Sequence, residues 1–463
     1  MKNNSNFFVF LHANNKEYKQ KYIGKMKVLK FGGTSVGSPE RMKGVCQLIN
    51  DGEKKIVVLS AMSGTTNSLV EISDYLYKQN PEGANEIINK LERKYKQHVN
   101  ELYSTDEYKQ KTLALIKDIF NGIRSFTKDI FTMFEEKVIL SQGELLSTNM
   151  VTNYMLEQGV NVVLLPALEF MRTDKNGEPD TAFIKNKLAA QLEMHPDADL
   201  YITQGYICRN ACGEVDNLQR GGSDYSASLI GAAINASEIQ IWTDIDGMHD
   251  NDPRIVDKTS PVRQLHFEEA AELAYFGAKI LHPTCIQPAK YANIPVRLLN
   301  TMEPSAPGTL ISNDTELGKI KAVAAKDNIT AIQIKSGRML LAYGFLRKVF
   351  EIFESYQTSI DMICTSEVGV SVSIDNTKHL KEILNDLKKY GTVNVDHDMC
   401  IICVVGDLRW ENVGFEAKAL DAMREIPVRM ISFGGSDYNI SFLVSKEDKK
   451  RALQSLSDHL FNH

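Results

Sequence analysis

The stretch KVLKFGGTSVGSPE, residues 27–40, decides the fold of this 463-residue chain. KVLKF has the pattern of a β-strand, and the glycine pair that follows it indicates a turn. Ser38 and Pro39 then predict the start of a helix, because serine is a favoured N-cap and proline fits the first helical position. A strand, a glycine turn and a helix in this order open an α/β unit.

The alternation of strand and helix continues to about residue 313. One long helical region, 67–158, is expected to break near Asn80-Pro81 and near Ser104. The pattern predicts a mainly parallel sheet covered by helices over residues 26–313. The other expected strands are KKIVVLSA, NVVLLPA, DLYITQGYI, EIQIWTDI and IPVRLL, and the expected helices include DYSASLIGAAINA and FEEAAELAYFG.

The character of the sequence changes after residue 313. Short strands and amphipathic helices follow one another in the same order twice, over 320–390 and over 398–463. This repeat predicts two ferredoxin-like units of the β-α-β-β-α-β type. Each such sheet has free edges, so we expect the units to pair.

The composition argues against several classes of protein. The net charge of −6 argues against binding to nucleic acid or to an anionic membrane, and no apolar run is long enough to cross a bilayer. Seven cysteines form no disulfide framework, so we expect free thiols in a reducing cytoplasm. Residues 1–25 are polar and rich in Asn and Lys. We expect them to be a disordered extension, and whether they belong to the native protein stays open.

The pentapeptide GGSDY occurs twice, at Gly221–Tyr225 and at Gly434–Tyr438. The second copy lies between two strand-like runs and has the composition of a turn between strands. The first copy runs directly into a helix, where free N–H groups and the positive end of the helix dipole favour an anion. Arg220 adds a guanidinium suited to a carboxylate. We therefore expect the first copy, with Ser223 and Asp224, to carry the chemistry.

Lys30, Gly32 and Gly33 form a second candidate group. Lys30 lies at the carboxyl end of the first strand, which is where ligands of open α/β sheets bind. A lysine ammonium there can neutralise a phosphoryl group, and the glycine amides can hold its oxygens. The stretch is not a Walker loop, because no GK[ST] stands at the required spacing. No G-x-G-x-x-G opens a helix after this strand, which argues against a dehydrogenase.

Six motifs together resemble the aspartate kinase family. In that family's order and spacing they are KFGGTSVG (30–37), SAMSGTTNSL (60–69), SQGELLST (141–148), RGGSDYSA (220–227), IWTDIDG (241–247) with DPR (252–254), and FGAKILHP (276–283). The two C-terminal repeats resemble the ACT domains of that family. The resemblance covers the chain from Met26 nearly to its end. It implies an amino-acid-kinase-like α/β/α sandwich with a mainly parallel sheet, followed by two ferredoxin-like ACT domains and no fused homoserine dehydrogenase.

The resemblance implies transfer of the γ-phosphoryl group of ATP to the side-chain carboxylate of L-aspartate. The product would be 4-phospho-L-aspartate, on the route to lysine, threonine and methionine. Lys30, Gly32 and Gly33 would neutralise and hold the transferring group. No general base is required, because the attacking carboxylate is already ionised. Mg²⁺ would arrive with the nucleotide, so no dedicated metal ligands are expected in the chain.

The contacts of the family fall on particular residues of this sequence. Arg220 suits the α-carboxylate of the substrate, and Asp224 suits its α-ammonium. His249 stands where the family often has a tyrosine near the adenine, and both a stacking histidine and an ordinary loop residue stay open. His282 is expected to be structural. The implied substrate contacts are Thr66, Glu144, Arg220, Ser223 and Asp224, and the implied nucleotide contacts are Lys30, Thr243, Asp244, His249, Arg254, Lys279 and Ile280.

Two further segments, 339–346 and 359–374, resemble the effector-binding region of lysine-sensitive aspartate kinases. Asp361 and Glu367 suit a cationic effector, although a solvated position at the end of a strand would also explain them. Ala342 stands where that group commonly has a serine, so the identity of the effector stays open. The resemblance implies inhibition by L-lysine through a homodimer formed by the ACT domains. The matching residues are Met339, Phe345, Leu346, Asp361, Ser366 and Glu367.

Two other functions stay open. One is another amino-acid kinase of this fold, acting on glutamate or its acetylated form. The combination of FGGTS, RGGSD and two ACT domains argues against it. The other is a catalytically silent amino-acid sensor. Loss of Lys30, Arg220 or Asp224 would favour a sensor, and all three are present.

Overall fold

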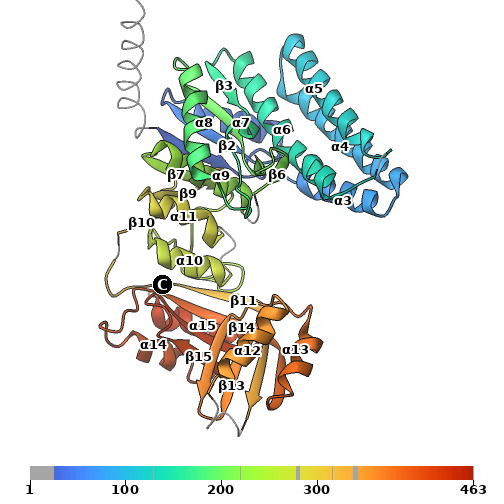
Figure 1. Cartoon of the computed structure of the whole chain (residues 1–463). Helices are drawn as coiled ribbons and strands as arrows, with labels where there is room; N and C mark the ends of the chain where they lie inside the picture. The colour runs from blue at the N-terminus through green and yellow to red at the C-terminus, as the bar shows by residue number, and fades with distance from the viewer. Residues whose placement is uncertain are drawn as a thin grey trace, which may run out of the picture. The chain divides into compact units, whose positions relative to one another are not determined.

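The computed structural model describes residues 26–128, 130–218, 221–277, 282–314, 316–336 and 343–461. These residues form two compact units (Figure 1). The first unit runs to Gly247 and resumes at Thr284–Asn313, and the second holds Met248–Pro283 and the chain from Asp314 onward. Residues 248–283, which lie within the segment expected at 26–313, therefore pack with the C-terminal unit.

The first unit is built on the mainly parallel sheet that the sequence predicts. Its strands follow the order β3-β4-β2-β1-β7-β9-β10, and β9 with β10 is the antiparallel pair among them. Because the other pairs are parallel, their carboxyl ends meet at one edge of the sheet. The strands are β1 (Lys27–Phe31), β2 (Lys55–Leu59), β3 (Val162–Leu165), β4 (Leu200–Gln204), β7 (Glu238–Thr243), β9 (Val296–Asn300) and β10 (Thr309–Ser312), with a separate hairpin of β5 (Ile207–Arg209) and β6 (Val215–Asn217).

The helices of this unit begin where the sequence supplies a cap. The Ser38 side chain accepts a hydrogen bond from the Arg41 amide, and Pro39 follows it, as predicted. The predicted breaks at Asn80 and Ser104 are confirmed, and α4 and α5 lie side by side (Figure 1). A third break, after Ser125, was not predicted. The helices are α2 (Pro39–Ile49), α3 (Thr65–Tyr77), α4 (Pro81–Leu102), α5 (Asp106–Ser125), α6 (Met133–Glu157), α7 (Ala167–Phe170), α8 (Thr181–Met194), α9 (Gly222–Ile234) and α11 (Pro283–Tyr291).

The main core of the first unit lies between the central strands and helices α2 to α6. Phe31, Val57 and Leu59 of the sheet are fully buried and belong to one cluster with Leu146 and Met150 of α6. All five residues of β2 are buried, as expected for a strand covered on both faces. Each such side chain contributes about 1.5–3 kcal/mol by its burial, so this cluster holds the strands that carry the candidate site.

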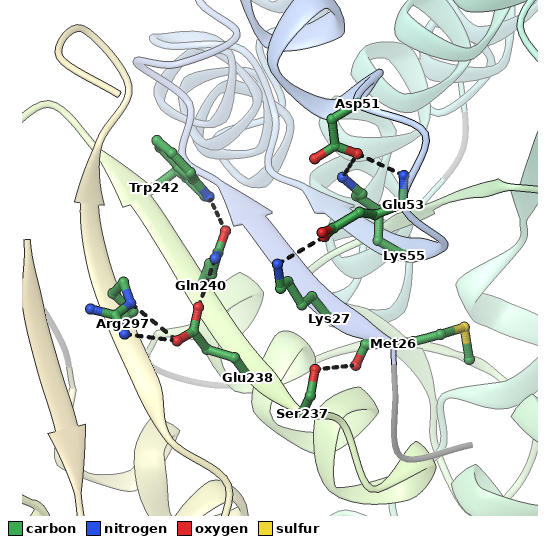
Figure 2. Close-up of polar contacts among 10 residues, drawn as sticks. All are labelled: Met26, Lys27, Asp51, Glu53, Lys55, Ser237, Glu238, Gln240, Trp242 and Arg297. Carbon is green, nitrogen blue, oxygen red and sulfur yellow. Dashed lines mark hydrogen bonds and ion pairs between the residues drawn. The ribbon is translucent and has the colours of Figure 1, made fainter. Parts of the chain in front are cut away.

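A row of polar contacts (Figure 2), together with one aromatic stack, keeps β7 in register with its neighbours. Glu238, Gln240 and Trp242 are alternate residues of β7 and therefore share one face. The Gln240 amide donates to Glu238 over 2.7 Å, Trp242 Nε1 donates to Gln240 over 3.1 Å, and Arg297 of β9 pairs with Glu238 at 3.0 Å (Figure 2). The Trp242 ring stacks on Phe31 of β1 at 5.7 Å between centroids. These contacts fix the positions of the ends of β1, β7 and β9 along the sheet.

The second unit contains one six-stranded antiparallel sheet. Its order is β12-β13-β11-β14-β16-β15, and β11 and β14 are its two long strands (Figure 1). Helix α12 packs with α13, and α14 packs with α15. The elements are β8 (Gln264–His266), α10 (Phe267–Tyr275), β11 (Ile320–Lys335), α12 (Phe345–Ser355), β12 (Met362–Ser366), β13 (Gly369–Ile374), α13 (Leu380–Leu387), β14 (Thr392–Gly406), α14 (Phe415–Ala422), β15 (Val428–Phe433), β16 (Asn439–Ser445) and α15 (Lys449–Leu460).

The two sequence repeats share their central strands. Residues 330–335 of β11 pair with β13, and residues 320–326 continue the same strand along β14, which itself pairs with β16. The pairing of β11 with β14 shifts register on both sides of Ile329, after Lys326 and before Ala331, and these shifts mark the joint between the halves. Each repeat therefore has four strands in the ferredoxin-like order, and two of them are common to both. This confirms the predicted fold class and adds the shared strands, which the sequence pattern did not indicate.

Gly143 allows α6 to pass close to the carboxyl end of β2. A Cβ atom there would lie 2.6 Å from the Cβ of Ala61, whereas a Cβ at Gly122, inside helix α5, would meet nothing within 4 Å. We expect Gly143→Ala to lower the free energy of unfolding by about 1–3 kcal/mol through overpacking. The control Gly122→Ala should leave it unchanged or raise it by up to about 1 kcal/mol. Urea unfolding of both variants measures this, and equal stabilities would contradict the close approach of α6.

Candidate active site

Lys30 and Asp224 form an ion pair at the carboxyl edge of the parallel sheet. Lys30 is on β1, Asp224 is in the first turn of α9, and 2.7 Å separate Lys30 Nζ from Asp224 Oδ1. The side chains are only 12% and 16% exposed. Charges this far from water need a partner, because each would otherwise lose its hydration without compensation. The pair therefore keeps a lysine ammonium ready at the position where ligands of such sheets bind.

The glycine pair after β1 is held tightly between two other segments. The Gly32 amide donates to the Trp242 carbonyl over 3.2 Å, and the Ser63 amide donates to the Gly33 carbonyl over 3.0 Å. A Cβ atom at Gly33 would lie 2.7 Å from the Ala61 carbonyl oxygen, which is too close for any other residue. The loop that follows Lys30 therefore has one fixed course, next to the end of β2.

Glu144 is a buried carboxylate beside this loop. Only 5% of the residue is exposed, and Glu144 Oε1 accepts a hydrogen bond of 3.1 Å from the Ala61 amide. Burial raises the pKa of Glu144 to about 7, and both this hydrogen bond and the charge of Lys30 oppose the increase. Glu144 is therefore not a solvated surface carboxylate, and its protonation changes near neutral pH.

The start of α9 packs directly against the end of β4. A Cβ atom at Gly205 would lie 2.5 Å from Ser223, and one at Gly222 would lie 2.4 Å from the Tyr206 ring. Tyr206 has a φ of 67°, in the left-handed region that residues other than glycine rarely adopt, and its amide donates to Ser226 over 2.9 Å. Sequence analysis missed Tyr206. The only local signal for it was its place after a glycine at the end of a strand.

The other predicted residues of the first unit lie at the same edge of the sheet. Thr66 is exposed on the first turn of α3, while its neighbour Thr65 is buried and bonds the Tyr95 hydroxyl at 2.8 Å. Thr243 ends β7, and its hydroxyl donates to Asp244 over 3.1 Å. The strand ends and helix starts of this unit thus bring Lys30, Gly32, Gly33, Thr66, Ser223, Asp224, Thr243 and Asp244 to one edge, and Glu144 joins them from the middle of α6.

The remaining predicted nucleotide contacts are distributed differently. His249 and Arg254 belong to the second unit, where His249 Nδ1 lies 2.9 Å from the Thr259 hydroxyl. The Arg254 side chain is 79% exposed and binds Asp252 through two of its nitrogens, over 2.9 and 2.8 Å. Arg220, Lys279 and Ile280, together with Met339 and Ala342 of the effector segment, lie outside the described residues.

The predicted effector residues that the structure describes lie at the start of α12 and at the two ends of the edge strand β12. Phe345 is buried and Leu346 is 38% exposed in the first turn of α12. Ser366 bonds the Gly369 carbonyl at 3.4 Å, and Glu367 is exposed. Asp361 fits neither the interpretation as an effector contact nor the one as a solvated carboxylate in full, because its side chain is completely buried and bonded within the chain.

The second GGSDY is the turn between β15 and β16, as predicted. Gly434 has a φ of 90°, a conformation that glycine adopts without strain. The Tyr438 amide donates to the Ser436 hydroxyl over 3.2 Å, which closes the turn locally. The two identical pentapeptides therefore have different structures, and only the first copy lies at the carboxyl edge of the parallel sheet.

The described residues hold no cluster of three His, Cys, Asp or Glu side chains that could bind a metal ion. None of the seven cysteines, all of which the structure describes, forms a disulfide. Among the described helices, none combines the length and the apolar character needed to cross a membrane. The site is therefore a set of lysine, glycine, hydroxyl and carboxylate groups at a sheet edge, which can neutralise and position an anionic ligand.

Comparison with known proteins agrees with this geometry. The model of the amino acid kinase family matches residues 25–300, and an ACT domain model matches residues 402–460. Aspartokinase 1, chloroplastic, from Arabidopsis thaliana is 35% identical over 94% of this chain and 80% of its own length. Lysine-sensitive aspartokinase 3 from Escherichia coli strain K12 is 32% identical over 95% of this chain and its whole length.

Solved structures extend the likeness to three dimensions. The crystal structure of E. coli aspartokinase III in complex with aspartate and ADP gives a TM-score of 0.81 at 32% identity, covering 95% of this chain and 100% of that one. The form in complex with lysine and aspartate gives 0.78 at 32% identity, over 94% and 100%. The fold and its relatives define an α/β enzyme of the kinase class. The chain belongs to the amino acid kinase family and, within it, to the aspartokinases.

The raised pKa of Glu144 makes the stability of the chain depend on pH. The value is about 7 in the folded chain against an ordinary 4.5, so between these values the folded chain holds a proton that the unfolded chain has lost. Unfolding then releases this proton, and the contribution of Glu144 to stability falls as the pH rises through this window. Glu144→Gln should therefore become more stable relative to the native protein from pH 5 to pH 8.

Urea unfolding midpoints at four pH values between 5 and 8 measure this difference. Glu86→Gln, on an exposed face of α4, is the control for removing a carboxylate. A difference for Glu144→Gln that stays constant over this range would show that the carboxyl group titrates alike in the folded and unfolded chains.

Proposed function

We propose that this chain is an aspartate kinase, which transfers the γ-phosphoryl group of ATP to the side-chain carboxylate of L-aspartate. The observation that carries the proposal is the Lys30–Asp224 pair at the carboxyl edge of the sheet, beside the buried carboxylate of Glu144. Its relatives support it, since two of them are named aspartokinases and E. coli aspartokinase III has been solved with aspartate and ADP. The products are 4-phospho-L-aspartate and ADP.

The chemical problem is to bring two anions together. An oxygen of the substrate carboxylate attacks the γ-phosphorus, the bond from that phosphorus to the ADP oxygen breaks, and no proton has to move. Such a reaction needs positioning and neutralisation of charge more than covalent help. Lys30 supplies the charge, and its ammonium has three N–H donors, so it can keep Asp224 while it binds a phosphoryl oxygen. Asp224 acts by fixing the position of Lys30.

The acceptor needs a partner for its α-ammonium. Because Asp224 is paired with Lys30, we assign this role to Glu144, which is buried and is ionised above about pH 7. Arg220 is assigned to the α-carboxylate on the resemblance of RGGSD, with Ser223 and Thr66 completing the substrate contacts. Asp224, which the resemblance offered for the α-ammonium, would then serve the phosphoryl side of the site.

ATP is expected to bind with Mg²⁺, which neutralises part of the charge on its phosphates when bound. The nucleotide contacts proposed in the first unit are Lys30 on β1 and Thr243 and Asp244 at the end of β7. The others are His249, Arg254, Lys279 and Ile280. We also propose a homodimer through the ACT domains, as the resemblance to the aspartate kinase family implies. A cytoplasmic location is proposed on the strength of the free cysteines.

Release of ADP from ATP tests the activity directly. We expect turnover with L-aspartate and little with L-glutamate, and Lys30→Met should lower kcat by at least about 100-fold because it removes the charge aimed at the phosphoryl group. Lys27→Met is a matched control, since Lys27 lies on the same strand at its opposite end and pairs with Glu53. Native kcat in Lys30→Met would refute the role of Lys30. Turnover that prefers glutamate would indicate another amino-acid kinase, and no turnover in folded protein would favour the sensor.

L-Lysine is the proposed inhibitor, and Asp361, Ser366, Glu367, Phe345 and Leu346, with Met339, are its proposed contacts. The E. coli relative is named lysine-sensitive, and E. coli aspartokinase III has been solved with lysine. If Glu367 makes a charge-assisted hydrogen bond to the effector, Glu367→Gln should raise the half-inhibitory lysine concentration about tenfold or more. Glu354→Gln, exposed on α12, is the control. A tight lysine complex with unchanged turnover would overturn the proposal of inhibition.

A further inference from the structure

Helix α10 is attached to the regulatory sheet at both of its ends. At its start the His266 ring stacks on Tyr438 of the second GGSDY, with 5.3 Å between centroids and 8° between planes. Further along, Glu272 accepts a hydrogen bond from Asn439 of β16. At its end the Tyr275 hydroxyl donates to Asp361 Oδ1 over 2.9 Å. All of these residues belong to the second unit, so α10 is a part of the regulatory half of the chain.

The end of α10 is also held against one short segment of β11. A Cβ atom at Gly277 would lie 2.2 Å from the Ala325 carbonyl oxygen, and Gly277 has a φ of 120°. The next residue of β11, Lys326, places its ammonium 4.4 Å from the centroid of the Tyr275 ring. Figure 1 shows α10 next to β11. Tyr275 is thus in contact with β11 and with Asp361 at the same time, and it is the last residue before the motif FGAKILHP.

Asp361 is at the centre of a charge cluster in which, among the described residues, two carboxylates share one ammonium. Lys326 Nζ lies 2.7 Å from Asp361 Oδ1 and 2.9 Å from Asp375 Oδ2, so one ammonium serves two carboxylates. The Asp361 side chain is completely buried, and among the described residues no hydrogen-bond donor reaches its Oδ2. Burial raises the pKa of Asp361 although Lys326 opposes the increase. A buried carboxylate oxygen without a donor costs free energy that a cationic ligand would recover. Because the Asp361 side chain is completely buried, such a ligand reaches the carboxylate only if a group that covers it, such as the Tyr275 hydroxyl, moves away.

We propose that Tyr275 is a positioning residue whose hydrogen bond to Asp361 competes with a cationic amino-acid effector. This inference rests on the proposed function, because it takes Asp361 as part of the effector site and the FGAKILHP segment as part of the nucleotide site. In the free protein, Lys326 and Tyr275 hold the Asp361 carboxylate and keep the end of α10 against β11. An effector ammonium that binds Asp361 weakens this attachment at the residue that leads into the nucleotide segment.

The competition predicts a definite result for Tyr275→Phe, which removes the hydroxyl and keeps the ring under Lys326. The effector no longer has to displace a hydrogen bond, so L-lysine should bind about tenfold more tightly, and its half-inhibitory concentration should fall by the same factor. Turnover without lysine should be lower than native, because the variant has already lost the attachment of α10 that the effector weakens. A merely structural role would lower stability or turnover and leave the dissociation constant for lysine unchanged.

Tyr356→Phe is the matched control. The Tyr356 hydroxyl, at the end of α12, donates to Asp386 of α13 over 2.9 Å, and it therefore takes no part in holding Asp361. This variant loses a tyrosine–aspartate hydrogen bond of the same length and should bind lysine like the native protein. Equal shifts in both variants would overturn the inference, since they would report a general loosening of the sheet.

Titration calorimetry with L-lysine alone separates this inference from the proposed function. Tighter lysine binding by Tyr275→Phe would support the competition even in a chain that shows no turnover with aspartate, which would overturn only the kinase activity. Native lysine affinity in Tyr275→Phe would overturn the competition and leave the kinase intact. Failure of the native chain to bind millimolar lysine would overturn the effector assignment and, with it, this inference.

Discussion

The arrangement of the first unit depends on one ion pair, between the Lys30 ammonium and the Asp224 carboxylate. The two groups are 2.7 Å apart, and both are largely withdrawn from water. Each charge alone would cost several kcal/mol to bury, so neither can be placed without the other. Lys30 reaches the edge because β1 is held between β2 and β7 in a regular parallel register. Asp224 reaches it because α9 begins against the end of β4, where glycines at 205 and 222 leave room for Ser223 and Tyr206.

Much of this architecture can be predicted from the sequence, because its signals are local. A cap at Ser38 and a proline after it begin a helix whatever surrounds them. The start of α6 also has a local signal, because Thr132 and Glu135 form a capping box. We did not predict this break, because the helical pattern continues on both sides of it. The two strands that the repeats of the second unit share, β11 and β14, were harder to predict. The run Lys326–Asp327–Asn328 has the composition of a turn, and in the fold it is the irregular joint within one continuous strand.

The candidate site, too, could be predicted only in part. Sequence identifies the residue types and their order, because GGSDY before a helix and a lysine at a strand end have chemical meaning by themselves. Burial and partnership depend on segments far apart in the chain. Glu144 is withdrawn from water because Gly143 lets α6 approach Ala61, and no pattern around Glu144 contains that contact. Asp361 is bonded within the chain by Lys326 of β11 and Tyr275 of α10, which are distant from it in the sequence. Its local sequence therefore suggested a solvated or a ligand-bound carboxylate and did not indicate an internal ion pair.

Each half of the chain has a buried charge that is proposed to contact a ligand, and the sign of that charge is opposite in the two halves. In each, an internal lysine–aspartate pair keeps a buried charge compensated while no ligand is present: Lys30 with Asp224, and Lys326 with Asp361. In the proposed function, an anionic ligand contacts the lysine of the first pair, which has donors to spare. The proposed cationic effector contacts the aspartate of the second pair, whose Oδ2 has no donor among the described residues. Because this aspartate side chain is completely buried, the effector would have to displace groups of the chain, and its affinity would be reduced by the free energy of the contacts it displaces. A regulatory site built in this way responds to the accumulation of its effector, and it does not retain the effector when the concentration falls.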